Sequence, residues 1–308
     1  MRQLFRKLPS VCLKRSLSRR ESFRLAFGSL CARYLCGAET ASHKTPDLAA
    51  KIPPRQHRAL TGSQFSEFVA GIEGRDRERA ILHQLLAGNL PDFLRKFVPV
   101  EMSCETPGKA KVSATIFVMP EYLAIGSDAD FLRIPMNLYT ARAVADRFHC
   151  VFPTRKMVDA IYDQSGFHFT PQPLPAGPQM RSTEYYRRHN GMIEKQSEAR
   201  GIPSGPLVAG HKKDVVLTNR LARNPGQIAI YGWHRGTADP IQPLSTVHGA
   251  GYADYSHGIR LISDRVLVDG KCRSLSDVLR DPLLAKAFSD EGSLREVLDM
   301  WARQPAAA

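Results

Sequence analysis

Residues 111–134, KVSATIFVMPEYLAIGSDADFLRI, decide the fold class of this chain. β-Branched and aromatic residues predict a strand over residues 111–119, and Pro120 ends it. Residues 122–125 and 131–134 predict two further short strands, joined by a Gly-Ser-Asp turn. Because only short turns separate these strands, this part of the chain predicts a mainly antiparallel or mixed sheet.

Helices and strands extend outward from this sheet in an uneven order. Helical spacing of apolar residues predicts helices over residues 63–72, 76–87, 91–97, 138–148, 154–162 and 182–199. Further along the chain, strands are predicted over residues 214–218, 227–231, 258–262 and 266–268, and helices over residues 275–279 and 293–301. Helices come first, strands are central, and strand–helix–strand alternation is absent. The sequence therefore predicts an α+β fold, with a helical N-terminal part packed on the sheet.

The N-terminal segment, residues 1–43, differs in composition from the rest of the chain. Nine Lys or Arg and two acidic residues within residues 1–41 account for +7 of the formal net charge of +13. Such a basic segment, rich in Arg and Ser, predicts a targeting signal. Residues 44–59 contain three prolines and predict a linker. Residues 60–308 are then expected to form a single α+β domain.

Residues 18–23, SRRESF, resemble a twin-arginine export signal, and the apolar run at residues 25–30 follows them. Phe23 lies one place later than in that signal, and Arg33 interrupts the apolar region. The resemblance implies an exported protein, periplasmic or extracellular. A mitochondrial transit peptide and a disordered basic tail are the alternatives.

Charge and cysteine content limit the classes of partner. The remaining +6 over residues 42–308 is too small an excess to predict a nucleic-acid-binding surface, so nucleic acid is not expected as a partner. No run approaches the roughly 20 apolar residues that cross a bilayer, so no transmembrane segment is expected. Cys104, Cys150 and Cys272 are too widely spaced for a metal-ligand motif. A polymeric or small-molecule substrate is the expected partner.

Histidines concentrate in one part of the sequence. His211, His234, His248 and His257 all lie within 47 residues, although the chain has only ten histidines. Histidine suits proton transfer near neutral pH and is the commonest metal ligand. Because three of the segments that carry these histidines lie at the ends of predicted strands, we expect them to converge in one cleft.

Specific roles follow from the residue types around these histidines. The candidate catalytic residues are His211, Asp214, His234, His257 and Asp254, and the candidate substrate-binding residues are Tyr231, Trp233, Lys212 and Arg260. If residues 254–260 are extended, Asp254 and His257 lie on opposite faces of the strand. Each of these histidines also has an ordinary structural role open to it, as a hydrogen-bonded strand residue.

Residues 245–254, STVHGAGYAD, resemble the zinc-binding stretch of D-alanyl-D-alanine metallopeptidases. The Ser-to-His spacing is one residue longer than in that family, and the His-to-Asp spacing is one residue shorter. The resemblance implies His248 as a metal ligand and a divalent metal such as zinc as a cofactor.

A second resemblance extends over residues 60–290. The stretches GNLPDFLR (88–95), GHKKD (210–214), YGWH (231–234) and DYSHG (254–258) resemble a family of bacterial and fungal proteins of uncharacterised function. This resemblance implies a coherent structural unit of that extent, and it carries no activity.

These observations favour an exported hydrolase that acts on an envelope or environmental polymer, a polysaccharide or a peptide-sugar. One alternative is a phosphodiesterase or nuclease, in which Lys212 and Arg260 stabilise a phosphate. Another is a non-catalytic ligand-binding module that uses the aromatic residues. Convergence of the histidines distinguishes the two enzymes from the binding module.

Overall fold

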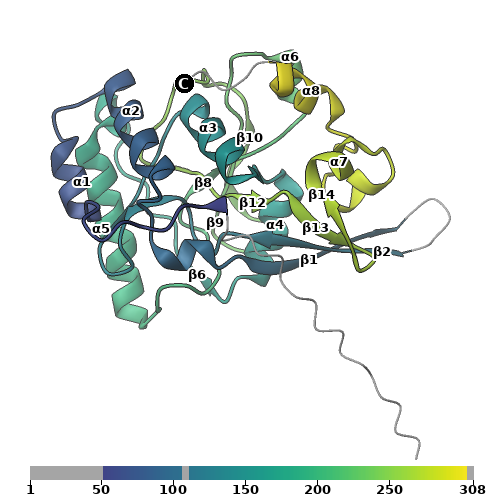
Figure 1. The fold of residues 1–308 in the computed structure, drawn as a ribbon, viewed down its shortest axis with the longest axis horizontal. Helices are drawn as coiled ribbons and strands as arrows, with labels where there is room; N and C mark the ends of the chain where they lie inside the picture. Colours follow the sequence, from purple (N-terminus) through teal and green to yellow (C-terminus); the bar gives the residue numbers. More distant parts are fainter. Residues whose placement is uncertain (1–50, 106–110, 304–308) are drawn as a thin grey trace, which may run out of the picture. The chain divides into compact units, whose positions relative to one another are not determined.

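The computed structural model describes residues 51–105 and 111–303. One continuous hydrophobic core runs from Ile52 to Leu298 and contains side chains from both sheets and most helices. Figure 1 shows α1, α2 and α5 grouped at one end of this unit and α6, α7 and α8 grouped at the other, with strands between them. The segment predicted to target the protein, residues 1–43, lies outside the described residues.

The larger sheet has six strands, and all of its pairings are antiparallel. Its central strand is β2, which pairs along its whole length with β1 and along its other edge with β12 and β13. The strands are β1 (Val98–Glu105), β2 (Lys111–Val118), β5 (Cys150–Val151), β12 (Ile262–Ser263), β13 (Arg265–Val268) and β14 (Lys271–Ser274). The predicted strand at residues 111–119 is therefore the centre of the sheet.

The smaller sheet has four strands in the order β10-β9-β8-β11, and its β8–β11 pair is parallel. Its strands are β8 (Lys213–Val215), β9 (Ile230–His234), β10 (Pro240–Ser245) and β11 (His257–Gly258). Two short ladders complete the strands: β3 (Ala124–Gly126) with β4 (Phe131–Arg133), and β6 (Phe167–His168) with β7 (Val208–Ala209). The smaller sheet carries five of the ten predicted site residues: Asp214, Tyr231, Trp233, His234 and His257.

Helices surround these sheets. They are α1 (Gly62–Phe68), α2 (Gly74–Leu86), η2 (Asp92–Arg95), α3 (Leu138–Phe148), α4 (Arg155–Gln164), η3 (Pro178–Arg181), α5 (Thr183–Arg200), α6 (Arg220–Arg223), α7 (Leu275–Arg280), η4 (Leu284–Ala287) and α8 (Arg295–Arg303). Side-chain caps start several of them. Asn137, Thr154 and Ser182 each accept a hydrogen bond from the backbone N–H three residues later. Thr61 forms a full capping box with Gln64.

The structure confirms the predicted α+β class. None of the helices in the described ranges is both long and apolar enough to cross a membrane. Residues 51–59, the described part of the predicted linker, pack against the rest of the unit. Ile52 is buried in the core, and the Arg55 guanidinium donates to Asn89 Oδ1 and to the carbonyls of Gly126 and Ala59.

Gly258 sets how closely the two sheets approach each other. A Cβ added at this position lies 2.6 Å from Cδ1 of Tyr122 and 2.8 Å from Cβ of Lys212. Only a hydrogen leaves room for the Tyr122 ring, which follows the end of β2 and packs against β11. The glycine is required here by space, because its backbone is not in the left-handed region.

We expect Gly258→Ala to lower the free energy of unfolding by about 1–3 kcal/mol, the usual effect of overpacking a core. Gly236→Ala is the matched control, since no atom lies within 4 Å of the added Cβ there. Urea denaturation of both variants measures the difference. Equal stability of the two variants contradicts this packing.

Candidate functional site

His257 is the most unusual histidine in the described part of the chain. It lies in β11, only 1% of the residue is exposed, and neither ring nitrogen has a hydrogen-bond partner among the described residues. Its Nε2 lies 4.0 Å from Oδ2 of Asp254. Both ring nitrogens are therefore free to form a hydrogen bond with a water molecule or a ligand.

The Asp254 carboxylate is held in place by two neighbours. Oδ1 accepts hydrogen bonds from the backbone N–H and the hydroxyl of Ser256, at 2.8 and 2.6 Å. Oδ2 accepts one from the Tyr252 hydroxyl at 3.0 Å. Because these three donors fix the carboxylate, it can orient an adjacent histidine.

The backbone around Asp254 forms a turn, which corrects the expectation of an extended segment. The His257 N–H donates to the Asp254 carbonyl at 3.1 Å, and the Ser256 bonds to Oδ1 form a local side-chain turn. Asp254 and His257 therefore lie beside each other, whereas an extended strand would place them on opposite faces. The physical reason is that aspartate competes for its own backbone donors.

His248 and Tyr252 are more exposed neighbours of this buried pair. Their rings stack at 4.2 Å between centroids, and both residues are half-buried. The ring centroid of His257 is 6.3 Å from that of His248 and 5.7 Å from that of Tyr252. Asp254, His257, His248 and Tyr252 are called the His257 cluster below.

Lys213 and Trp233 border the His257 cluster. Lys213 is the register partner of His257 in the parallel β8–β11 pair, so their side chains share one face of the sheet. Its Nζ lies 5.3 Å from the centre of the Trp233 ring. Trp233 has a positive φ of 56°, which turns its side chain out of the alternation of β9. Trp233 Nε1 and Nδ1 of the neighbouring His189 also lack partners among the described residues.

Burial controls the protonation of the His257 cluster. Desolvation, with smaller effects of Lys213 and His248, lowers the pKa of His257 to about 4, although Asp254 opposes the shift. Burial acts to raise the pKa of Asp254, but His257 and the hydrogen bonds from Ser256 outweigh it and lower that pKa. At pH 7 the pair is therefore a neutral imidazole beside a carboxylate, the state in which histidine accepts a proton.

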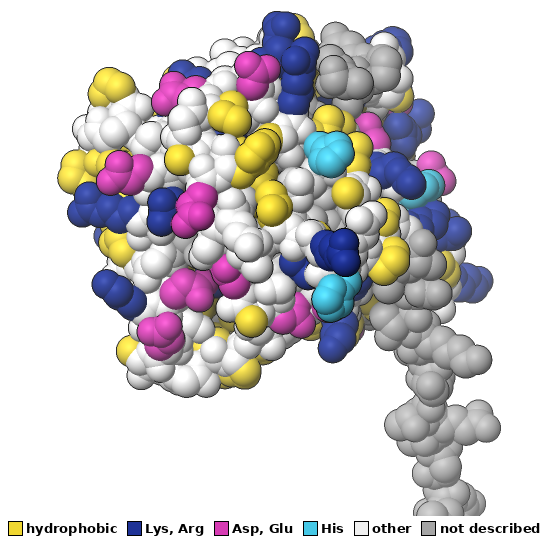
Figure 2. Space-filling model, turned by 60° about the vertical axis from the view of Figure 1, so that its left-hand side comes forward, with side chains coloured by type: hydrophobic (Ala, Val, Ile, Leu, Met, Phe, Trp, Pro, Cys, Tyr) yellow, Lys and Arg dark blue, Asp and Glu magenta, His cyan; other side chains and the backbone are white. Residues whose placement is uncertain are grey.

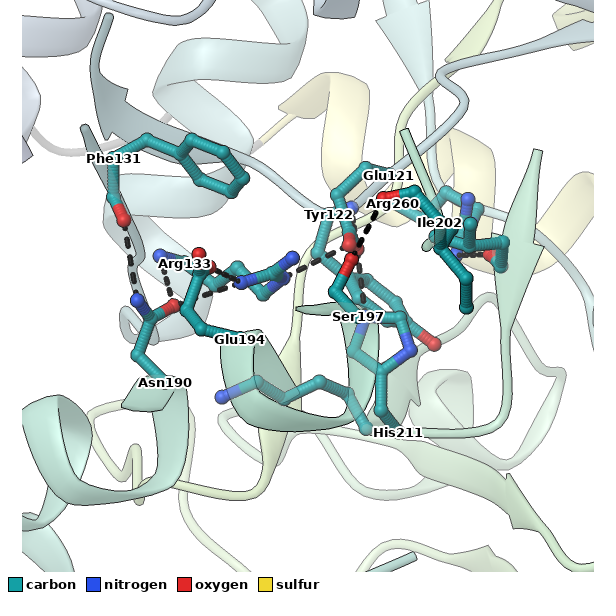
Figure 3. Close-up of polar contacts among 12 residues, drawn as sticks. Glu121, Tyr122, Phe131, Arg133, Asn190, Glu194, Ser197, Ile202, His211 and Arg260 are labelled. Carbon is teal, nitrogen blue, oxygen red and sulfur yellow. Dashed lines mark hydrogen bonds and ion pairs between the residues drawn. The ribbon is translucent and has the colours of Figure 1, made fainter. Parts of the chain in front are cut away.

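His211 belongs to a different buried network, centred on Glu121 (Figure 3). Its Nε2 donates to Glu121 Oε1 at 2.7 Å, and Arg133 Nε donates to Oε2 at 2.8 Å. Arg133 also donates to Glu194 at 2.6 Å and to Asn190 at 3.1 Å. Burial acts to raise the pKa of Glu121, but His211 and Arg133 outweigh it and hold that pKa below its ordinary value. Glu121 is thus a charged carboxylate whose two oxygens are both occupied.

Asp214 and Arg260 form a third buried group around Tyr122. The Tyr122 hydroxyl donates to Asp214 Oδ2 at 2.8 Å, and the Arg260 guanidinium lies 4.3 Å from the centre of the Tyr122 ring. Arg260 donates to the Met119 and Val208 carbonyls, and its Nε lies 3.8 Å from Asp214 Oδ1. Burial raises the pKa of Asp214 to about 6.

Lys212 is equally enclosed. Its Nζ donates to the Tyr255 carbonyl at 2.6 Å, and burial lowers its pKa to about 7. The cavity beside Lys212, Asp214 and Arg260 has a volume of about 10 Å³. Such a space is about that of one water molecule, so no substrate reaches these groups. Lys212 and Arg260, predicted to bind substrate, instead bind backbone carbonyls inside the fold.

His234 and Tyr231 share a fourth location, on the side of β9 that faces α4. His234 Nε2 lies 3.0 Å from Asp159 Oδ1, and the Tyr231 hydroxyl donates to the same oxygen at 2.7 Å. The His234 ring also stacks on Tyr162, with 4.8 Å between centroids. Asp159 thereby anchors two side chains of β9 to α4.

The four histidines do not converge in one cleft, contrary to expectation. His211, His234 and His257 each have their own carboxylate, at Glu121, Asp159 and Asp254. Only His248 and His257 are neighbours. The predicted partner Asp214 is also separated from His257, because the register of Lys213 with His257 and of Asp214 with Gly258 places the two side chains on opposite faces of the sheet. Within residues 51–105 and 111–303, no three His, Cys, Asp or Glu side chains are arranged to hold a metal ion.

Sequence reasoning missed several members of these networks: Glu121, Tyr122, Arg133, Asp159, His189 and Lys213. Glu121 and Tyr122 could have been identified from the sequence, because they directly follow Pro120, which ends the predicted strand at residues 111–119. Asp159 lies on a predicted helix, where an acid usually indicates a solvent-facing position.

No protein-family model matches this chain, and neither a curated protein nor a solved structure is significantly similar to it.

Histidine NMR tests the environment of His257. We expect its ring to titrate near pH 4, well below the ordinary value of about 6.5. Between these two pH values the unfolded chain binds the extra proton, so this group destabilises the fold as the pH falls. Loss of one resonance in His257→Gln assigns the signal. A midpoint at or above 6.5 contradicts the burial argument.

Proposed function

We propose that this protein is a hydrolase in which His257 acts as the general base. One observation carries the proposal: a buried, neutral imidazole with no hydrogen-bond partner among the described residues lies 4.0 Å from a fixed carboxylate. Such a histidine takes a proton from a water molecule, which then attacks the substrate, and returns the proton to the leaving group.

The neighbours of His257 fit supporting roles in that reaction. Asp254 stabilises the imidazolium that forms when His257 accepts the proton. The Lys213 ammonium, on the same face of the sheet, offers a positive charge for an oxyanion that develops in the transition state. His248, half-buried and 6.3 Å from His257, is placed to exchange protons with solvent.

The substrate that suits this site is a small molecule or the end of a larger one. His257 is only 1% exposed, so a continuous polymer chain cannot lie directly on it. A polysaccharide or peptide-sugar remains a candidate through its terminal unit, which the half-buried Tyr252 ring can contact, whereas the Trp233 ring, predicted to bind substrate, is buried in the core.

A phosphodiesterase or nuclease has less support than the hydrolase. The two cations predicted to serve it, Lys212 and Arg260, are committed to backbone carbonyls. Basic and acidic side chains are also interspersed on the face shown in Figure 2, which has no continuous basic surface for a nucleic-acid backbone.

A panel of chromogenic esters, amides, glycosides and phosphoesters tests the hydrolase proposal on the full chain. We expect turnover of at least one class, and a loss of about 100-fold or more in His257→Gln, the usual contribution of a general base. His83→Gln, at an exposed helix position, is the matched control and is expected to keep full activity. Turnover that is equal in both variants, or absent from the whole panel, overturns the proposal.

We further propose that the protein is exported, from the resemblance of residues 18–23 to a twin-arginine signal. Expression in a bacterium with a twin-arginine system is expected to release a shortened chain outside the cytoplasm. Arg19→Lys together with Arg20→Lys should retain the full-length chain inside. N-terminal sequencing of both products measures this, and import of the chain into mitochondria supports the alternative.

A further inference from the structure

A hollow close to the His257 cluster is lined by arginines. Its volume is about 450 Å³, and it lies against the first turns of α2 and α3. Its lining includes Arg75, Arg77, Glu78, Arg79, Tyr139 and Arg181. This hollow is called the arginine pocket.

Positive charge in the arginine pocket is not balanced by contacts within the protein. Arg79 pairs with Asp76 at 3.5 Å, and both side chains are largely exposed. Arg75, Arg77 and Arg181 have no carboxylate within 4.0 Å among residues 51–105 and 111–303. Three guanidinium groups therefore face or border the same hollow without a paired anion.

Arg77 is the most informative of these arginines, because it is only 5% exposed. Its terminal nitrogens donate to the hydroxyls of Thr183 and Tyr186, each at 3.2 Å, and its guanidinium lies 4.8 Å from the centre of the Tyr186 ring. Its Nε is buried without a partner. Neutral hydroxyls satisfy only part of a buried cation, and leaving it without a counter-ion is costly.

Glu78 is the one acidic side chain that lines the arginine pocket, and its oxygens are already used. They accept the Asn137 N–H at 3.1 and 3.2 Å. Burial raises the pKa of Glu78, although Thr140, Asn137 and the nearby arginines oppose the shift. Glu78 is a single acid among four arginines in the lining, so an excess of positive charge is left for another anion.

We propose that the arginine pocket binds a small organic anion through a phosphate or carboxylate group. Guanidinium groups match both oxyanions by paired hydrogen bonds. Leu82 and Tyr139 offer an apolar wall for the organic part, and the volume suits a small-molecule ligand.

Tyr252 connects the arginine pocket to the His257 cluster. Its neighbours Gly251 and Ala253 line the pocket, and the Arg181 guanidinium lies 5.5 Å from the centre of its ring. The bound anion is then the anchoring group of the hydrolase substrate. That assignment rests on the proposed function, whereas anion binding itself does not.

Isothermal titration of the full chain tests anion binding with phenyl phosphate, benzoate and inorganic phosphate, and with benzyl alcohol as the neutral probe. We expect saturable binding of at least one organic anion and none of benzyl alcohol. Arg181→Gln and Arg77→Gln should each weaken binding about tenfold or more, since each removes a charge-assisted contact. Arg181 is exposed, so its variant keeps the test valid if Arg77→Gln fails to fold.

Arg187→Gln is the matched control, because this exposed arginine of α5 does not line the arginine pocket. Unchanged affinity in Arg187→Gln with weaker affinity in Arg181→Gln supports the proposal. Absence of binding by every anion, or equal affinity in both variants, overturns it. His257→Gln is expected to bind the anion as the native chain does. If the native chain binds the anion but hydrolyses no substrate of the panel, the hydrolase is refuted and the anion site stands.

Discussion

The buried guanidinium of Arg260 is the constraint on which much of this structure depends. It is 0% exposed, so its donors need partners inside the protein, and its two terminal nitrogens have them, whereas Nε has none among the described residues. The carbonyls that satisfy it come from the end of β2 and from β7, and the Tyr122 ring lies against its face. These elements are far apart in sequence, and the cation requires them to meet. Where they meet, the Tyr122 ring packs against Gly258. Gly258 pairs with Asp214 in the parallel β8–β11 ladder, and the same register pairs His257 with Lys213.

Local sequence patterns correctly predicted the elements that are determined by nearby residues. The apolar spacing and the Asn137 cap locate α3 at its predicted bounds, and the apolar run of residues 111–119 forms β2. Strands that depend on partners were missed. Val98–Glu105 alternates weakly and gains its stability by pairing with β2 along its whole length. Pro240–Ser245 contains two prolines, which an edge strand tolerates and a propensity argument rejects.

Local sequence patterns also predicted only one part of the candidate site. The stretch that contains His248, Asp254 and His257 is short, and it does bring these residues together. His211 and His234 were assigned to the same cleft because they lie near strand ends, but which face a side chain occupies depends on register, and register is set by distant pairings. The carboxylates that separate the histidines, Glu121 and Asp159, lie 90 and 75 residues from their partners, beyond the reach of any local pattern.

The Tyr252 side chain contacts both the arginine pocket and the Asp254 carboxylate of the His257 cluster. Its ring lies beneath Arg181 at the edge of the arginine pocket, and its hydroxyl donates to the carboxylate that lies beside His257. An anion that shifts this ring changes the proton affinity of the cluster. Thermodynamic linkage makes the effect reciprocal, so protonation of the cluster alters anion affinity by the same factor. If the arginine pocket binds an anion as proposed, the pH of the surroundings therefore changes how fully that anion occupies it.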